Sequence, residues 1–465
     1  MGDGVTDDKA AILRAIAAAA APTEAPMIDL GRALARFPST GIRMLARWNV
    51  MDFGAHADGT TDDVAHIQSA IMAAGAAPVY FPPGDYKLAS TLTVPSYANL
   101  IGSGMATAWL KGKVFFSSNS SFSDLKIGDS GSGALHHIDG ATATIFTRCH
   151  IRGGLVGETP AAWVNNTINL GNDASCDHIT FVDCEVERNL GASNNLSIIE
   201  NGSTSGGAHV SDITFSGCHV GVTNGTAIGG PRMGIECYTS PNGSNVALHG
   251  WSNVNIINCV FEATNSCCVD FADYPLGSGD HASGPVLVSG CTIKGGGYGG
   301  GIWGYAVCIE SPHDVIIENN TIYRGYNRAL NVGYTSGLPT GLIIRDNTID
   351  LTYDNGITPT GDQYTPANEI LGSNVTISGN TFTTGTGGGG QILVLDTLSS
   401  SSVTGNHFYD SRASSIPRAI AYLNCTSDSI TGNDLHNTGS TSNPIIFDAG
   451  GNTGMTVSGN TLTHN

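Results

Sequence analysis

Short apolar segments of three to five residues, rich in Ile, Val, Phe and Leu, recur from about residue 120 to the end of the chain. Each is followed by a turn pair, then by Cys or Asn, one further residue and another apolar residue, as in FVDCEV, VSGCTI, IENNTI and ITGNDL. Past residue 80 the 3.6-residue period of an amphipathic helix is absent, and short runs bounded by Gly, Asn and Ser are typical of β-strands. The pattern predicts an all-β chain built from many short strands.

The Cys or Asn of this phrase marks a repeat of 26 to 41 residues. A unit of this size cannot bury its own apolar face and must stack on a copy of itself. Propeller blades would need about 40 or more residues with four strands each, so a parallel β-helix with one coil per repeat fits better. The markers then form an internal, structural ladder, in which Asn bonds to its neighbours and Cys fills the same volume. They are Cys149, Cys184, Cys218, Cys259, Cys291, Asn320, Asn347, Asn380, Asn406, Asn433 and Asn460.

One helical pattern precedes the coils, in TTDDVAHIQSAIMAAG. It has a Thr/Asp N-cap region with acids in the first turn, and Val64, Ile67, Ile71 and Met72 recur at helical spacing. Because the open end of a β-helix exposes unpaired strand edges, we expect this helix to cover the first coil. PVYFPPGDYKL follows and predicts a strand, a turn and a second strand.

The stretch FGAHADGTTDDVAHIQSAI, with VYFPPGDYKL and LIGSG after it, resembles the N-terminal signature of the pectate-lyase-like superfamily. Phage tailspike depolymerases, mannuronan epimerases and many secreted glycosidases carry this signature. The resemblance covers roughly residues 51 to 104 and implies a right-handed parallel β-helix with an N-terminal α-helical cap. It does not specify a reaction, because fold does not fix chemistry. The N-T-D, D-D and G-H-G motifs of polygalacturonases and the D-P-H-E motif of mannuronan epimerases are not found on the coils, so neither catalytic set is transferred.

The first residues, MGDGVTDDKAAILRAI, are a degraded echo of the same signature. We expect residues 1–50 to form a degenerate cap-like segment or an arm, residues 51–104 the cap helix and first coils, and residues 105–465 the β-helix proper. The echo suits a chain that begins inside a longer parent protein, and equally a duplicated cap that joins subunits.

Charge and cysteine spacing exclude several classes of protein. Lys and Arg number 20 against 39 Asp and Glu, and a net charge of −19 argues against nucleic acid or an anionic membrane as partner. No run approaches the roughly 18 apolar residues of a membrane span, and no signal peptide is seen. The 11 cysteines lack the C-x-x-C pairs of a zinc site, so we expect buried packing thiols and no metal.

Candidate chemistry lies in a second column, made of acids. Four phrases of the form apolar-apolar-acid, SIIEN, MGIEC, CCVDF and VCIES, fall in different coils and supply Glu200, Glu236, Asp270 and Glu310. Acids on adjacent coils would lie about 5 Å apart, the retaining range of glycosidases, and diagonal ones about 6.5 to 9.5 Å apart, the inverting range. We predict Glu236 and Asp270 as the catalytic pair, with Glu310, Glu200 and Asp273 in reserve. Solvated outward acids would give the same pattern, and unequal loops leave the register open.

Several cations and rings fall in the same coils. Arginines near an acidic column suggest recognition of an anionic sugar, and Trp and Tyr offer flat faces to sugar rings. We predict substrate binding by Arg232, Tyr238, His281, Trp303 and Arg328.

These residues favour a polysaccharide depolymerase, an endo-acting glycoside hydrolase on a bacterial surface or extracellular polysaccharide, with no cofactor. One alternative is a lyase that performs β-elimination on a uronate, which needs an anion-neutralising group and a base, with Arg232, His281 or a Tyr as candidates. A bound calcium ion could replace the first group. Another is a non-catalytic glycan-binding spike. The resemblance to tailspikes implies a homotrimer that is extracellular or virion-associated.

Overall fold

The computed structural model describes residues 48–128, 136–138, 140–153, 168–170, 175–188, 199–201, 209–221, 234–239, 250–262, 267–273, 283–295, 304–310, 312–325, 327–333, 338–353, 368–384, 391–411, 419–437 and 446–464. The chain divides into two compact units, residues 1–47 and 48–465. The predicted cap-like segment or arm over residues 1–50 therefore lies almost entirely outside the described residues.

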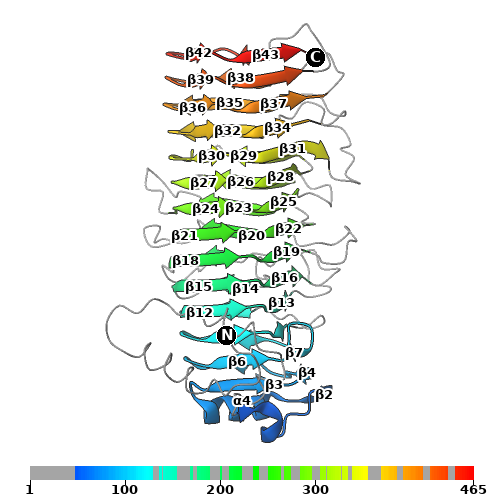
Figure 1. Cartoon of the computed structure of the whole chain (residues 1–465). Coiled ribbons are helices and arrows are strands. Elements are labelled where there is room, and N and C mark those ends of the chain that lie inside the picture. The colour runs from blue at the N-terminus through cyan, green and yellow to red at the C-terminus, as the bar shows by residue number, and fades with distance from the viewer. Residues whose placement is uncertain are drawn as a thin grey trace, which may run out of the picture. The chain divides into compact units, whose positions relative to one another are not determined.

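From Trp48 onward the chain winds around three parallel faces, with one strand on each face per coil except in the first and last coils, which lack a strand on the third face. Figure 1 shows the coils stacked upon one another. Sheet 1 contains β1 (Trp48–Asn49), β3 (Pro78–Phe81), β6 (Asn99–Gly102), β9 (Ser121–Ser123), β12 (Thr142–Thr147), β15 (Cys176–Val182), β18 (His209–Ser216), β21 (Gly250–Ile257), β24 (Val286–Ser289), β27 (Val315–Glu318), β30 (Ile343–Arg345), β33 (Thr376–Ser378), β36 (Ser402–Thr404), β39 (Ser429–Thr431) and β42 (Thr456–Ser458).

Sheet 2 contains β2 (Asp58–Asp62), β4 (Gly84–Lys87), β7 (Ala108–Lys111), β10 (Lys126–Ile127), β13 (His150–Gly153), β16 (Glu185–Arg188), β19 (His219–Gly221), β22 (Val260–Glu262), β25 (Thr292–Lys294), β28 (Thr321–Arg324), β31 (Thr348–Tyr353), β34 (Thr381–Thr383), β37 (His407–Asp410), β40 (Asp434–Asn437) and β43 (Thr461–His464).

The third face has two sections, and β14 of the first contacts β17 of the second. Sheet 3a contains β5 (Leu92–Thr93), β8 (Val114–Phe115), β11 (His136–Ile138) and β14 (Ile168–Leu170). Sheet 3b contains β17 (Ile199–Asn201), β20 (Ile235–Thr239), β23 (Val269–Asp273), β26 (Tyr305–Glu310), β29 (Arg328–Val332), β32 (Asn368–Ser373), β35 (Leu393–Ser399), β38 (Ile420–Leu423) and β41 (Ile446–Asp448). The all-β, right-handed parallel β-helix expected from the sequence is confirmed.

The turn from sheet 1 to sheet 2 explains the repeated phrase of the sequence. Its first residue is left-handed, with φ of 55° at Asn319 and Asp346 and 65° at Gly379. Gly, Asn and Asp tolerate this conformation best, and they occupy most of these positions. The second residue is the Cys or Asn marker, and its side chain points into the stack.

The predicted ladder is confirmed in its hydrogen bonds. The Asn347 Nδ2 group donates to Asn380 Oδ1 at 2.9 Å, and the Asn347 backbone N–H donates to the same oxygen at 3.0 Å. Asn380 repeats both bonds to Asn406 and donates to the Ile344 carbonyl at 2.8 Å. Each amide therefore ties three coils together. Cysteines occupy the earlier rungs, where the thiol is a weak acceptor, as in the 3.5 Å contact from the Cys149 N–H to Cys184 Sγ.

Stacked apolar side chains fill the interior. Phe122, Phe146, Phe181 and Phe215 form a column of nearly parallel rings with centroids 4.8 to 4.9 Å apart, which is the spacing between neighbouring strands. All four are buried. One sequence position repeated on successive coils thus becomes a continuous core.

Helix α4 (Val64–Ala74), preceded by the short 3₁₀ helix η1 (Val50–Phe53), contacts β1 and β3 at the first coil, as the cap prediction requires (Figure 1). Two details differ from the prediction. Met72 is 69% exposed, and the buried face consists of Ile67, Ala70 and Ile71. The first turn contains no acid, because Asp63 stands at the N-cap and turns its carboxylate away from the helix.

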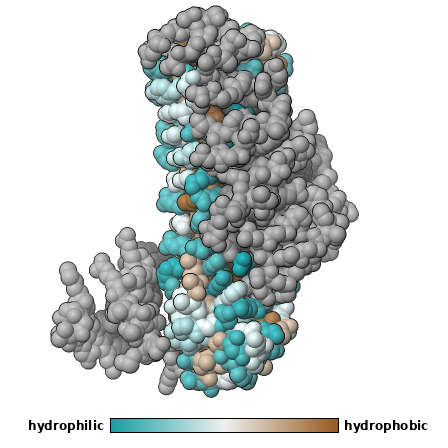
Figure 2. Space-filling view, turned by 90° about the vertical axis from the view of Figure 1, so that its right-hand side faces the viewer, coloured by the Kyte–Doolittle hydropathy of each residue, from teal (hydrophilic) through white to brown (hydrophobic). Residues whose placement is uncertain are grey.

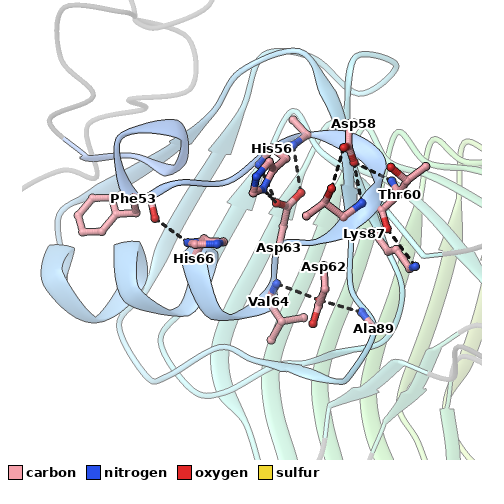
Figure 3. A network of polar contacts seen from close by, with 12 residues as sticks. Phe53, His56, Asp58, Thr60, Asp62, Asp63, Val64, His66, Lys87 and Ala89 are labelled. Atoms are coloured by element: carbon pink, nitrogen blue, oxygen red, sulfur yellow. Dashed lines mark hydrogen bonds and ion pairs between the residues drawn. The ribbon is translucent and has the colours of Figure 1, made fainter.

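The carboxylates of the signature fold the segment before α4 onto the first coil (Figure 3). Asp63 is fully buried and accepts hydrogen bonds from the backbone of His56 at 2.7 Å and Ala57 at 3.1 Å. Asp62 bridges the N–H groups of Val64 and Ala89. Asp58 closes a turn by accepting from the backbone of Thr60 and Thr61, which holds the pKa of its carboxyl well below the ordinary value. The signature is therefore structural.

The outward positions are mainly polar, and Figure 2 shows that hydrophilic side chains predominate over the coloured part of one face. Exposed large apolar side chains among the described residues are scattered singly, for example Ile145 and Tyr409. Among these residues, no helix is long and apolar enough to cross a membrane.

Candidate active site on the outer face of sheet 3b

Glu236 and Asp270 are register partners on the neighbouring strands β20 and β23. The residues that flank them, Ile235, Val269 and Phe271, belong to the hydrophobic core, so both carboxylates lie on the outer face of the sheet. The column continues through Cys308, Asn331 and Glu369, on β26, β29 and β32. One face of sheet 3b thus presents two acids, a thiol, an amide and a third acid on five successive coils.

These side chains are outward but shielded from bulk water. Glu236 is 6% exposed, Asp270 7% and Glu310 4%. Burial and the charges of Asp270 and Glu236 raise the pKa of the neighbouring core thiol Cys237 well above its ordinary value. A group of buried carboxylates is costly unless it is paired or used, so the site is unlike a solvated surface column.

The four predicted acids do not form one column. Glu310 is in register with Ala272, and Glu200 is in register with Tyr238. Both therefore lie two residues further along their strands than Glu236 and Asp270, in the adjacent outward row. Glu310 still joins the site, because the Cys308 thiol donates to its Oε1 at 3.7 Å.

A repeated break in strand alternation brings further groups together. Cys268 and Val269 both face the core, as do Ala306 with Val307 and Ala329 with Leu330. Two successive inward residues bend a strand, so the outward residues on either side of the bend approach each other although they are three apart in the chain. The converging outward pairs are Cys267 with Asp270, Tyr305 with Cys308 and Arg328 with Asn331.

The first two pairs form one compact group. Cys267, Tyr305 and Cys308 pack together as a small buried cluster apart from the main core. The Cys267 thiol, and then burial and the charge of Asp270, raise the pKa of Cys308 well above its ordinary value. Burial likewise raises the pKa of Tyr305, although the charge of Arg328 opposes this.

The third pair supplies the cation of the site. Arg328 Nη1 donates to Asn331 Oδ1 and forms an ion pair with Glu369. Asn331 Nδ2 in turn approaches Cys308 Sγ at 3.5 Å. A continuous polar chain therefore runs from Glu369 through Arg328 and Asn331 to the thiols and carboxylates.

Gly234 permits the close approach on which the pair depends. A Cβ atom at this position would lie 2.2 Å from the Cys268 carbonyl oxygen. The Ile235 N–H donates to the same oxygen at 3.0 Å. Because position 234 is a glycine, the start of β20 can approach the start of β23 closely. This approach sets the register in which Glu236 lies opposite Asp270.

Only some of the predicted site residues can be located in the structure. Four of them lie on one face of the sheet: Glu236, Asp270, Glu310 and Arg328. Three more are on strands of sheet 3b, but their side chains are outside the described part of the chain: Glu200, Tyr238 and Asp273. The remaining three are entirely outside the described residues: Arg232, His281 and Trp303. Arg324, another arginine of these coils, is in β28 of sheet 2 and donates to the Asn327 carbonyl at 2.9 Å.

Sequence reasoning missed Cys267, Cys308 and Glu369 as members of the site. The motif VCIES contains Cys308 beside Glu310, but a cysteine between apolar residues predicts packing. The signal that could have found these residues is the recurring pair of outward residues three apart, which stands in the sequence at CCVD, YAVC and RALN.

Comparison with known proteins supports this architecture. The family model for rhamnogalacturonase A/epimerase, pectate lyase-like, matches residues 47–270, which include both Glu236 and Asp270. This match, over just under half of the chain, supports a relationship to the pectate-lyase-like superfamily. The surface adhesin PfbA of Streptococcus pneumoniae has the same fold, with a TM-score of 0.51 at 13% identity over 90% of this chain and 91% of its own.

Curated relatives match this chain only locally. Mannuronan C5-epimerase AlgE2 of Azotobacter vinelandii is 40% identical over 74 residues, 14% of this chain and 7% of its own length. Alginate lyase 7 of the same organism is 39% identical over 74 residues, 14% of this chain and 9% of its own. The chain thus spans less than a tenth of the length of these two relatives, and the match leaves its own activity open.

Proposed function

We propose that this β-helix is an enzyme that acts on carbohydrate polymers, and specifically an endo-acting glycoside hydrolase whose catalytic pair is Glu236 and Asp270. The observation that carries the proposal is their direct register on the outer face of sheet 3b. Paired strands lie about 4.8 Å apart, which approaches the roughly 5 to 5.5 Å between the carboxyl groups of retaining glycosidases. We therefore expect retention of anomeric configuration.

The surroundings favour this use of the pair. Shielding from bulk water strengthens the electrostatic interactions of both carboxylates with charge that develops on the sugar. Arg328 lies further along the same face, two coils beyond Asp270, and we expect it to exchange its ion pair with Glu369 for an acidic substituent of the polymer. A face that repeats at each coil suits an extended chain, which agrees with cleavage within the polymer. The local matches to enzymes of alginate also favour an acidic glycan.

A lyase is the second candidate, and the match to alginate lyase 7 favours it. β-Elimination needs a group that neutralises the uronate carboxylate and a base that removes the C5 proton. Arg328 or a bound calcium ion would serve as the first, and Tyr305 is the described tyrosine of the site. Tyr305 is a poor base in this setting, because burial raises its pKa.

Product analysis tests the proposal. The full chain is incubated with a panel of acidic and neutral bacterial polysaccharides, and products are followed by size exclusion, reducing-end assay, ultraviolet absorption and NMR of the anomeric proton. Hydrolysis yields new reducing ends without a new chromophore, and retention appears as the substrate's own anomer before mutarotation. An unsaturated uronate would replace hydrolase by lyase, and binding without shortening of any polymer would reduce the protein to a glycan-binding spike.

Assembly and location form part of the same proposal. We expect an extracellular homotrimer of the tailspike type, since the superfamily resemblance includes such depolymerases. Sedimentation equilibrium of the full chain measures the subunit number. A monomer that cleaves polymer would remove the trimer and leave the proposed chemistry intact.

A further inference from the structure

Cys267, Asp270 and Cys308 bring three potential metal ligands to one point of the site. One ligand atom from each, two Sγ atoms and a carboxylate oxygen, lie within 4.8 Å of one another, and all three residues are buried. Tetrahedral Zn²⁺ with sulfur ligands at about 2.3 Å separates its donor atoms by roughly 3.5 to 3.8 Å. Small side-chain rotations would therefore bring this trio onto a single ion.

Winding of the chain creates the site. Cys308 follows Asp270 by one coil and is its register partner, while Cys267 reaches the same point through the bend at Cys268 and Val269. The C-x-x-C spacing of zinc proteins is therefore unnecessary here, because a coil converts a separation of about 40 residues into contact between neighbours. The sequence expectation of no metal depended on that spacing alone.

The surroundings support a cation at this point. Cys308 Sγ contacts Glu310 Oε1 at 3.7 Å, which leaves the fourth position to Glu310 or to water. Asn331 Nδ2 lies 3.5 Å from the same sulfur and is held by Arg328, as the outer partners of metal ligands commonly are. Tyr305 packs with the two cysteines in one buried cluster. A buried group of two sulfurs and one carboxylate has the composition of a thiolate metal site.

We infer that Cys267, Asp270 and Cys308 bind a divalent, thiophilic metal ion, best represented by Zn²⁺. Two sulfur donors select against Ca²⁺ and Mg²⁺, which take oxygen ligands, and favour zinc with its tetrahedral preference. The alternative is that the two thiols only pack against Tyr305, as buried cysteines often do.

The metal site and the proposed catalytic pair share Asp270. An oxygen of Asp270 that is bound to zinc is no longer available to a sugar, so the metal-loaded protein is the inactive form. This consequence rests on the proposed function, whereas metal binding itself rests only on the arrangement of the three ligands. A thiophilic metal would then inhibit cleavage by capturing one carboxylate of the pair.

Cobalt titration tests the site without any substrate. Full-length protein, kept reduced and freed of metal by a chelator, is titrated with Co²⁺ and followed by visible and near-ultraviolet absorption. We expect one Co²⁺ per chain, with tetrahedral ligand-field bands and a thiolate charge-transfer band that Zn²⁺ abolishes. C267S and C308S should lose the charge-transfer band and bind at least about 100-fold more weakly, and N331A should bind about 10-fold more weakly.

Cys268→Ser is the matched control, because Cys268 is the adjacent buried thiol but belongs to the main core, with its Sγ 3.3 Å from the Lys294 carbonyl. It should bind Co²⁺ like wild type. Circular dichroism confirms folding, and if the serine variants do not fold, N331A and D270N carry the test. Absence of the band in wild type, its equal loss in C268S, or a Cys267–Cys308 disulfide in unreduced protein overturns the inference.

The activity arm separates the two proposals. If polymer is cleaved, Zn²⁺ should lower the cleavage rate of the wild-type protein. The C267S variant should cleave at nearly the same rate with zinc as without it. Metal binding without any cleavage of polymer would sink the proposed function alone. Cleavage by a protein that binds no cobalt would sink the metal site alone.

Discussion

Glu236 and Asp270 face each other from adjacent strands of sheet 3b, and neither is more than 7% exposed. Few surface acids combine direct stacking with such shielding, because like charges repel and burial penalises both. The combination is what separates this pair from the outward acids elsewhere on the stack, such as Glu318, which pairs with Arg345 on sheet 1.

Replacing either member by its amide should abolish turnover with little change in fold. We expect E236Q and D270N each to lower kcat on the cleaved polymer by about 10³-fold, within the range for loss of a general acid or base. The double variant should be scarcely worse than either single one, because the two groups act as a unit. Initial rates of reducing-end release measure this. Glu318→Gln is the control, and near-normal rates in both site variants would move the chemistry elsewhere.

The ladder should dominate stability in the later coils. Asn380→Ala removes four hydrogen bonds inside the stack, two accepted from Asn347 and two donated to Asn406 and to the Ile344 carbonyl. We expect a loss of about 3 kcal/mol in the free energy of unfolding, because buried partners are left unsatisfied. Urea denaturation measures it, and Thr381→Ala, on the outer face next to Asn380, should cost less than about 1 kcal/mol.

Cysteine at the same position should be an intermediate case. Asn380→Cys keeps most of the volume and offers a weak acceptor, as Cys184 does to the Cys149 N–H. We expect roughly half the loss of Asn380→Ala by the same urea assay. A cysteine variant as unstable as alanine would mean that volume contributes little and that the amide bonds hold the rung.

The signature turn at Asp58 should make the cap sensitive to acid. Because backbone hydrogen bonds lower the folded pKa of Asp58, its contribution to stability is present above its ordinary pKa, about 3.9, and is lost as pH falls toward the lowered value. D58N should melt below wild type at pH 7, and the difference should shrink below pH 4. Thermal melts at a series of pH values decide it, and parallel curves for both proteins would contradict it.

Asp428 should behave in the opposite sense. It is buried, and burial raises its pKa although its Oδ1 accepts a hydrogen bond from the Ser401 N–H at 2.6 Å. A raised folded pKa means that stability falls as pH rises above the ordinary pKa of the group. Asp428→Asn keeps an acceptor without the charge, so it should melt a few degrees above wild type at pH 7. The two should coincide near pH 3, where Asp428 is protonated, and a lower melting temperature at pH 7 would refute this account.

The sequence sufficed for those parts of the fold in which one position repeats along the axis. Asn347 and Asn380 could be placed in a ladder because a left-handed turn residue and an inward amide recur together. Met72 could not be judged from apolarity, because the face of α4 that meets the first coil is set by Ile67, Ala70 and Ile71, and Met72 points away from them.

The site was predictable only where simple alternation holds. Glu236 and Asp270 follow the rule that neighbours of core residues face outward, and the structure pairs them in register, which the unequal loops had left open. Cys267 and Cys308 were not predicted as site residues, because two successive residues next to each of them face inward. These inward pairs are Cys268 with Val269 and Ala306 with Val307. A strand with such a bend sends residues three apart to the same side, and periodicity of two cannot reveal it.

Because each Asn rung bonds only to the coils directly before and after it, the fold has no centre that must be preserved as a whole. Whole turns of the solenoid beyond β35 could be lost or duplicated in evolution while Glu236 and Asp270 kept their immediate surroundings. Length and local chemistry are thus separately variable in this molecule, and the number of coils can change while the surroundings of the acid pair stay the same.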